Sequence, residues 1–392
     1  MIDKLLPQSC ALCGSCADAC PVSAISFRKP YLDFNYPQID TDACINCGLC
    51  EKVCPVLNTP DAPPQVSPHV YAAKNPDEAV RRKSTSGGIF RAMADHILSR
   101  GGYVCGAVFD ERFQVHHIVS NKADDIDRMM GSKYAQSDLS GVYRQIKQLL
   151  HEGAPVLFTG CPCQVAGLHS FLGKKYDTLI TADLICHGIP SGTMLRAYLD
   201  LQEQKYRSKV QSLCFRDKKH GWHRSSVRIR FANGAEYCQP ITNDAYMAGF
   251  LGGIYLKESC YDCHFKEFRS GSDLTLGDFW GSEFCRPALD DNIGLSAVIS
   301  NSEKGCTFLS NCGLELWEDR LKSVICYNRN LITSTGKNPD RNGFYADAQI
   351  AGYSQTIKAR LVEPPLKKFF RESRFLLQRV VYAVLGREKP LY

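Results

Sequence analysis

The sequence of 392 residues lacks any long hydrophobic run that would cross a membrane as a helix, which needs about 18 or more consecutive apolar residues. Its first ten residues, MIDKLLPQSC, lack the apolar core of a signal peptide. Basic residues are not interleaved with aromatic residues along any stripe, which argues against binding of nucleic acid. We therefore expect a cytoplasmic protein that does not recognise nucleic acid.

Cysteine, in contrast, is abundant, with 20 residues. In a long chain without a secretion signal, such a number favours metal ligation over disulfide bonds. The formal net charge of +6 counts every cysteine as neutral. A 4Fe-4S core of charge +2 held by four thiolates is a dianion, so about three such clusters would bring the net charge to about zero. The mildly basic balance is thus poor evidence for an anionic partner.

Two cysteine runs near the N-terminus share the spacing C-x2-C-x2-C-x3-C-P, which is typical of bacterial two-cluster ferredoxins. In that arrangement the first three cysteines of a run bind one cluster and the fourth binds the other. We therefore assign one 4Fe-4S cluster to Cys10, Cys13, Cys16 and Cys54, and the other to Cys44, Cys47, Cys50 and Cys20. Zinc knuckles or disulfides would not require two matching runs that each end in proline.

The chain divides at a segment with four prolines, NTPDAPPQVSP, which indicates a semi-rigid linker. We expect a bacterial ferredoxin-like domain at residues 1–57 and the linker at residues 58–69. An α/β domain with a largely parallel sheet should follow at residues 70–206, because predicted strands and helices alternate there. Residues 207–345 are expected to be α+β, with antiparallel hairpins around an Asn233-Gly234 turn.

A looser group of cysteines lies in these two parts of the chain. Cys163 and Cys186 follow two successive predicted strands, and loops at the carboxyl ends of neighbouring parallel strands share one sheet edge. Cys260 and Cys263 form a C-x2-C pair that cannot saturate a metal alone. We predict that these four cysteines bind a third 4Fe-4S cluster, with a structural zinc as the alternative and Cys161 as an alternative to Cys163.

The remaining cysteines fit the role of small, buried apolar residues. They are Cys105, Cys214, Cys238, Cys285, Cys306, Cys312 and Cys326.

A series of motifs, KSTSGGIF, GSKYAQS, VLFTGCPCQVAGL, LICHGIPSG, SCYDCHFKEFRSGSDLTLGDFWG and DDNIGLSAVI, covers much of the chain. In this order the motifs resemble the beta subunit of coenzyme F420 (deazaflavin) hydrogenases and dehydrogenases. The chain looks most similar to bacterial relatives that occur among polysaccharide-synthesis genes and carry an N-terminal two-cluster ferredoxin domain.

The resemblance implies FAD beside an iron–sulfur cluster, and it maps the family's cluster ligands onto Cys163, Cys186, Cys260 and Cys263. The family usually has threonine where this chain has Cys161. For FAD the resemblance points to TSGG and GSKY, that is, to Ser86, Gly87, Gly88, Gly131, Ser132, Lys133 and Tyr134.

The FAD assignment is physically consistent, because Ser86, Gly87 and Gly88 open a predicted helix whose free amides suit a phosphate. An ordinary capped helix is the alternative. Lys133 is the candidate catalytic residue, since a cation facing the flavin ring would stabilise an anionic reduced flavin. A solvated surface lysine is the alternative for Lys133.

Residues 346–392 are expected to form a helical, amphipathic tail, because LKKFFRESRFLLQRVVYAVLGREK carries apolar residues on one side and is rich in Lys and Arg. Such a helix would dock on an anionic membrane surface, on a partner protein, or on the core of its own chain.

Together these features predict an iron–sulfur flavoprotein oxidoreductase that passes electrons between 4Fe-4S clusters, FAD and an organic substrate or deazaflavin-type coenzyme. An external ferredoxin or another redox protein would be the partner, and the sequence allows either direction of flow. The alternative is an electron-transfer subunit that has no substrate site of its own and acts inside a larger complex.

Overall fold

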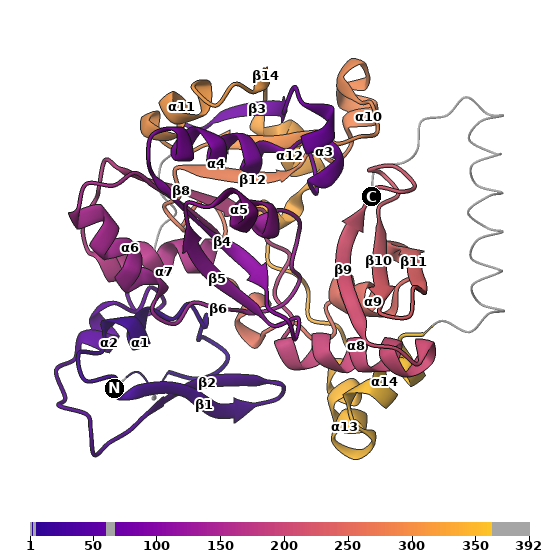
Figure 1. The fold of residues 1–392 in the computed structure, drawn as a ribbon. Coiled ribbons are helices and arrows are strands. Elements are labelled where there is room, and N and C mark those ends of the chain that lie inside the picture. The colour runs from indigo at the N-terminus through magenta and orange to yellow at the C-terminus, as the bar shows by residue number, and fades with distance from the viewer. Residues whose placement is uncertain (1, 3–4, 60–66, 363–392) are drawn as a thin grey trace.

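The computed structural model describes residues 2, 5–59 and 67–362. The N-terminal part contains two short helices, α1 (Ser15–Ala19) and α2 (Leu49–Lys52), and a hairpin of β1 (Ile25–Tyr31) and β2 (Phe34–Ile39) (Figure 1). Each helix lies within one cysteine run and begins after a glycine in the left-handed region, with φ of 87° at Gly14 and 73° at Gly48. A side chain would be strained at either position, so both glycines are needed to turn the chain within a run.

A nine-stranded mixed sheet forms the centre of the molecule, with the order β14-β3-β13-β12-β8-β7-β4-β5-β6. The ladders that join β12, β8, β7 and β4 are parallel, whereas β13, β3 and β14 extend the sheet with antiparallel pairings. The strands are β3 (His69–Lys74), β4 (Tyr103–Phe109), β5 (Val115–Ser120), β6 (Ser137–Asp138), β7 (Val156–Gly160), β8 (Leu179–Leu184), β12 (Leu274–Asp278), β13 (Ser296–Ser300) and β14 (Glu315–Asp319). The predicted α/β architecture is confirmed.

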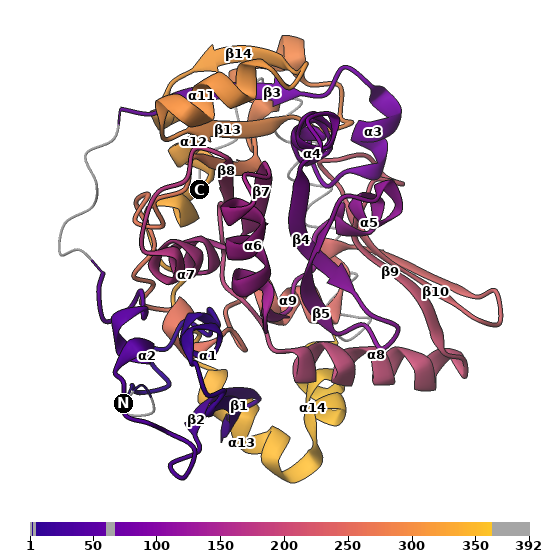
Figure 2. The same cartoon turned by 60° about the vertical axis from the view of Figure 1, so that its left-hand side comes forward.

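Helices cover both faces of this sheet (Figure 2). Apolar residues of α4, α5 and α11 pack on one face, and those of α6 and α7 pack on the other. The helices of this part are α3 (Glu78–Lys83), α4 (Ile89–Ser99), α5 (Ala123–Met129), α6 (Val142–His151), α7 (Pro162–Leu172), α10 (Ser282–Cys285), α11 (Glu303–Ser310) and α12 (Leu321–Tyr327). Neighbouring residues of one strand, such as Leu157 and Phe158, enter opposite cores, which explains the continuous apolar run of β7.

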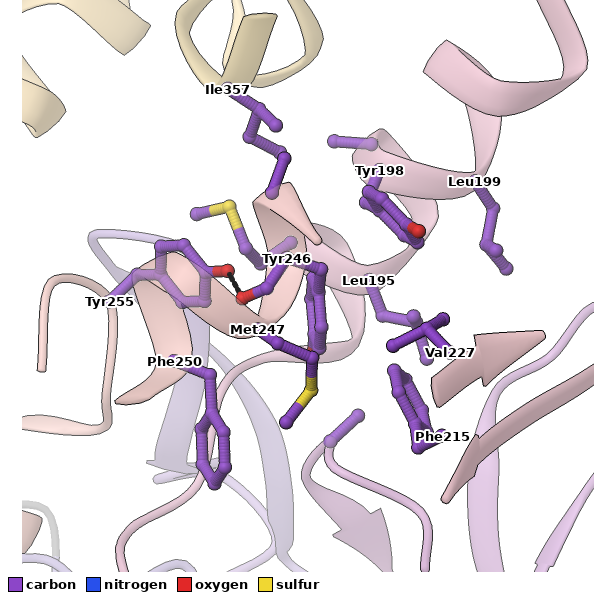
Figure 3. Close-up of a cluster of buried hydrophobic side chains, with 14 of the residues drawn as sticks. Leu195, Tyr198, Leu199, Phe215, Val227, Tyr246, Met247, Phe250, Tyr255 and Ile357 are labelled. Atoms are coloured by element: carbon purple, nitrogen blue, oxygen red, sulfur yellow. Dashed lines mark hydrogen bonds between the residues drawn. The ribbon is translucent and has the colours of Figure 1, made fainter. Parts of the chain in front are cut away.

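A second, three-stranded antiparallel sheet has the order β11-β10-β9 and packs against helices from three parts of the chain. Figure 3 shows Leu195, Tyr198 and Leu199 of α8 with Phe215 of β9 and Val227 of β10 in one apolar cluster. The elements are α8 (Gly192–Tyr206), β9 (Val210–Asp217), β10 (Ser226–Phe231), β11 (Glu236–Pro240), α9 (Ala245–Leu251), α13 (Arg341–Ala351) and α14 (Tyr353–Arg360). The predicted Asn233-Gly234 turn joins β10 to β11, with Gly234 at φ 83°.

Helix α6 begins at Val142, where the buried Asp18 carboxylate accepts hydrogen bonds from the amides of Gly141 (2.7 Å) and Tyr143 (2.9 Å). Asp18, which belongs to the ferredoxin domain, thus caps α6, and no local sequence pattern predicts this contact.

Within residues 346–362 the predicted C-terminal tail is helical, but its amphipathic segment from residue 366 lies outside the described residues.

None of the helices in the described part of the chain combines the length and the hydropathy that a membrane crossing requires.

Tyr143 joins the ferredoxin domain to α7. Its side chain is fully buried, and its hydroxyl lies 2.8 Å from the carbonyl oxygens of both Cys13 and Gln164. Tyr143→Phe removes the donor and leaves two buried carbonyls without it, so we expect the free energy of unfolding to fall by about 1–3 kcal/mol. Urea unfolding without oxygen measures this. Tyr176→Phe, which removes only a part-exposed contact to His151, is the matched control and should change little.

His117 contacts the C-terminal end of β7, where the loop to Cys161 begins. Its ring contacts Ser137 Oγ (2.7 Å) and the Thr159 carbonyl (3.1 Å), and burial lowers its pKa from 6.5 to about 4. Below about pH 6.5 the unfolded chain therefore takes up a proton that the folded chain takes up only near pH 4, so stability is lost as the pH falls through this window. The stability advantage of the wild type over His117→Gln should be constant above pH 7 and shrink by up to about 1.4 kcal/mol per unit below pH 6. An advantage independent of pH between 7.5 and 5 would contradict this account.

Candidate cluster and flavin sites

The eight cysteines of the ferredoxin domain line two separate cavities. One cavity, of about 20 Å³, is lined by Cys10, Cys13, Cys16 and Cys54, which we call the proximal set. The other, of about 100 Å³, is lined by Cys20, Cys44, Cys47 and Cys50, which we call the distal set. Each set thus combines three thiols of one run with the fourth of the other, which is the crossed arrangement that the spacing predicts.

The two sets differ in their access to solvent. All four cysteines of the proximal set are buried, whereas Cys47 of the distal set is exposed. Burial raises the pKa of the Cys10 thiol to about 12, although the backbone amide of Leu12 opposes this shift. Because a ligand must be a thiolate, the buried proximal cavity fits a bound group that itself carries positive charge, as iron does. The distal set lies where a partner protein could approach it.

The other four predicted ligands also lie together. Cys163 is in the first turn of α7, after β7, and Cys186 follows the parallel neighbour strand β8. Cys260 ends a short helical turn, η3 (Glu258–Cys260), and Cys263 follows it, with its amide donating to Ser334 Oγ (2.9 Å). We call Cys163, Cys186, Cys260 and Cys263 the third set.

Electrostatic coupling connects all members of the third set. Burial raises the pKa of the Cys163 thiol, and Cys263, Cys186 and Cys260 raise it further. Burial likewise raises the pKa of Cys260 to about 11, with added contributions from Cys186 and Cys263. The four thiols therefore share one small volume, although they come from three segments of the chain.

Cys161 occupies a different position in the same loop. It is the N-cap of α7, where its amide donates to Gln164 Oε1 (2.8 Å), and its thiol is hydrogen-bonded to Cys186. The hydrogen bond from Cys161 lowers the pKa of the Cys186 thiol. The main contributions to the pKa of Cys163 include all three other thiols of the third set, whereas those to the pKa of Cys161 come from Cys186, Cys163 and Lys257. This geometry favours Cys163 as the ligand and Cys161 as a donor to a neighbouring sulfur.

The spacing of the sulfurs distinguishes a single ion from a larger core. A tetrahedral zinc with Zn–S bonds of about 2.3 Å needs sulfurs only about 3.8 Å apart. Within residues 2, 5–59 and 67–362, no three of the cysteine sulfurs lie within 4.8 Å of one another. In this part of the chain, one group of potential ligands is that close together. It consists of His223, Glu283 and Asp290 and contains no cysteine. The four thiols of the third set are thus less compact than the ligands of a single bound zinc ion.

The proximal and third sets face each other across a thin layer of apolar side chains. Ala11, between two proximal cysteines, packs with Ala166 of α7 and Phe265, and Cys163 and Cys263 border the same cluster. In Figures 1 and 2 the ferredoxin domain lies beside α6 and α7, and α1 contacts both helices. The order from the surface inward is therefore distal, proximal and third.

The two segments that the resemblance links to FAD also meet. Thr85 Oγ1 and Ser132 Oγ are 3.1 Å apart. Gly88 precedes α4 with φ 82°, and no side chain caps this helix end. Gly87 donates its amide to Ser296 Oγ (2.9 Å), and a Cβ there would lie 2.6 Å from the Ala73 carbonyl oxygen. Close packing on β3 and β13 is thus sufficient to require glycine at position 87.

Lys133 and Tyr134, in the second of these segments, already have protein partners. The Lys133 ammonium donates to the carbonyls of Arg128 (2.7 Å), Met129 (2.8 Å) and Met130 (2.8 Å), where α5 ends. Burial lowers the pKa of Lys133 to about 7. Tyr134 packs against Phe250 and Phe215 at centroid distances of 4.8 and 5.3 Å. The hydrogen bonds of the Lys133 side chain therefore cap the C-terminal end of α5 in this structure.

A lysine that sequence analysis missed lies at the other segment. Lys218 Nζ donates to the carbonyls of Arg81 (2.6 Å) and Ser86 (2.8 Å), and Ser86 Oγ donates to the Leu295 carbonyl (2.8 Å). Burial lowers the pKa of Lys218 to about 7. In the sequence Lys218 stands in the charged stretch RDKKH, which reads as an exposed turn, so no signal marked it.

Comparison with protein families identifies three matching regions. Residues 9–58 match a 4Fe-4S dicluster domain. Residues 70–144 match the N-terminal part, and residues 153–315 the C-terminal part, of the coenzyme F420 hydrogenase/dehydrogenase beta subunit.

Comparison with individual proteins adds little. No curated protein matches the chain. Among solved structures, a chain of the xenon-derivatised F420-reducing [NiFe] hydrogenase complex from Methanosarcina barkeri is 17% identical, with a TM-score of 0.44, over 74% of this chain and 91% of that chain. Because the two beta-subunit regions together span more than half of the sequence, the chain belongs to the coenzyme F420 hydrogenase/dehydrogenase beta-subunit family and carries an N-terminal 4Fe-4S dicluster domain.

Proposed function

We propose that this protein is an iron–sulfur flavoprotein oxidoreductase with three 4Fe-4S clusters and one FAD. The observation that carries the proposal is the arrangement of twelve cysteines in three sets, ordered from an exposed distal set to a third set at the carboxyl edge of the sheet. When bound, the clusters would exchange single electrons, and FAD would exchange one or two.

The third set supports its part of the proposal by composition and by spacing. Four thiols converge there, and they are less compact than the ligands of a single bound zinc ion. Lys266, which donates to the Cys186 carbonyl (2.6 Å) and the Asn330 carbonyl (2.5 Å), brings a buried positive charge to this set. Such a charge offsets the negative charge of four thiolates around an iron–sulfur core.

The proposed FAD site lies where Thr85 and Ser132 meet. The uncapped N-terminal end of α4 and the cation of Lys218 would both favour the negative pyrophosphate of FAD. Ser86, Gly87, Gly88, Gly131, Ser132, Lys133 and Tyr134 remain the proposed contacts. For Lys133 to act on the flavin ring, its ammonium would exchange at least one of its three carbonyl partners.

The exposed distal set would exchange electrons with an external ferredoxin or a similar redox protein. The flavin would then serve an organic substrate or a deazaflavin-type coenzyme, in either direction. Because of the resemblance to relatives found among polysaccharide-synthesis genes, a sugar intermediate is the first organic substrate to test.

Protein purified without oxygen should contain about twelve irons, about twelve sulfides and one FAD per chain. Iron, sulfide and zinc analysis with a flavin spectrum measures this. About eight irons with one zinc would remove the third cluster. About twelve irons without flavin would favour the alternative, an electron-transfer subunit that works only inside a larger complex.

The two neighbouring cysteines of the α7 loop should behave differently on substitution. Cys163→Ser should lower the iron content by about four atoms, because it removes a thiolate of the third set. Cys161→Ser should keep these irons, because a serine hydroxyl at the N-cap can still donate to the Cys186 sulfur. Iron analysis and EPR spectra of the reduced proteins measure the difference. Loss of the same four irons in both variants, or in Cys161→Ser alone, would show that the ligand assignment is wrong.

A further inference from the structure

Lys257 is a charged side chain enclosed between the proximal and third sets. It immediately precedes η3, where its amide donates to the Ile189 carbonyl (2.8 Å) and its own carbonyl accepts from the Cys260 amide (2.9 Å). The residue is only 1% exposed, which is rare for lysine. A charge at such a position is costly unless an opposite charge lies nearby.

The hydrogen-bond partners of Lys257 are neutral. Its ammonium donates to the carbonyl of Ala11, between two proximal cysteines, and to Gln136 Oε1 at 3.3 Å. Across the described ranges, no aspartate or glutamate forms an ion pair with it. Its electrostatic partners are instead the sulfurs of Cys163 and Cys260 in the third set, Cys10 in the proximal set, and the hydroxyl of Tyr36. Three of these four partners are thiols of the two cysteine sets, which are thus the candidate source of the negative charge that balances Lys257.

Lys266 provides an internal comparison. It is also buried, but its ammonium binds the carbonyls of Cys186 and Asn330, and it interacts electrostatically with Cys186 and Cys263 of the third set. Lys257 lowers the pKa of the Cys10 thiol. Lys266 is not among the main contributions to the pKa of Cys10, Cys16 or Cys54. Lys266 thus faces one set, and Lys257 faces two.

We propose that Lys257 is the shared counter-charge of the proximal and third sets, and that it raises the reduction potentials of the clusters bound at both. This inference rests on the proposed cluster in the third set. A cluster held by four thiolates is a dianion that gains one more negative charge on reduction, so a fixed cation beside it favours the reduced form. In a buried site this attraction is weakly screened. One ammonium between two clusters therefore shifts both potentials in the same direction.

The neutral variant Lys257→Gln tests the charge, because glutamine still offers an amide donor to the Ala11 carbonyl. Redox titration of the full-length, cluster-loaded protein, followed by EPR, measures each cluster separately. We expect the reduction equilibria of two clusters to become at least tenfold less favourable, which equals about 59 mV for a one-electron couple. The distal cluster should keep its potential. Lys257→Arg, which keeps the charge, should resemble the wild type, and Lys266→Met should lower the potential of one cluster only.

Iron analysis of the same samples separates the possible failures. About twelve irons with unchanged potentials in Lys257→Gln would overturn the role of Lys257 and leave the proposed function intact. About eight irons in the wild type would instead overturn the proposed third cluster itself. If Lys257→Gln fails to retain iron in the third set while Lys257→Arg retains it, the requirement is for charge, and the proposal stands. If both variants lose that iron, the requirement is for the shape of lysine, and the proposal falls.

Discussion

The backbone carbonyls of the first cysteine run are held by side chains of the rest of the protein, and the arrangement of the three cysteine sets depends on these hydrogen bonds. Each donor comes from a residue that lies far away in the sequence. The pairs are Ser259 to Cys10, Lys257 to Ala11, Gln136 to Leu12, Tyr143 to Cys13, and Arg144 to Ala17, Asp18 and Cys20. Because Cys10, Ala11, Leu12 and Cys13 are buried, their carbonyls need these donors in place of water. The ferredoxin domain is therefore fixed in one orientation on the α7 side of the sheet.

This fixed orientation explains why the ferredoxin domain has one exposed and one buried set. The proximal set faces Ala166 and Phe265, and it gives up contact with solvent to lie beside the third set. The distal set keeps an exposed cysteine and apolar neighbours at the surface, such as Ile45 and Leu49. A chain that only stored electrons would not need this asymmetry. A chain that passes them between a surface partner and an internal site does, because short separation between successive centres has to be built into the packing.

The sequence was sufficient to predict those features that follow from local spacing or from topology. The crossed sharing of Cys20 and Cys54 follows from the x2-x2-x3 spacing, and the two observed cavities have these members. The meeting of Cys163 with Cys186 follows from the rule that neighbouring parallel strands end at the same edge. Features made by tertiary contact were not predictable. Asp18 sets the start of α6 from another domain, and Lys257 carries no pattern that distinguishes it from a surface lysine.

The buried lysines show why the net charge of this protein has to be interpreted from the structure and not from the sequence alone. Lys257, Lys266 and Lys218 add to the formal charge of +6, yet each directs its ammonium at a buried carbonyl beside a proposed cofactor site. Without the cofactors these ammonium groups are enclosed cations whose burial weakens the fold. With the three proposed dianionic clusters and the pyrophosphate of the proposed FAD, the same groups would become counter-charges, and the basic excess would disappear. Under that proposal, cofactor loading and folding stability are coupled through the same few side chains, and the fold would be most stable with its redox centres complete.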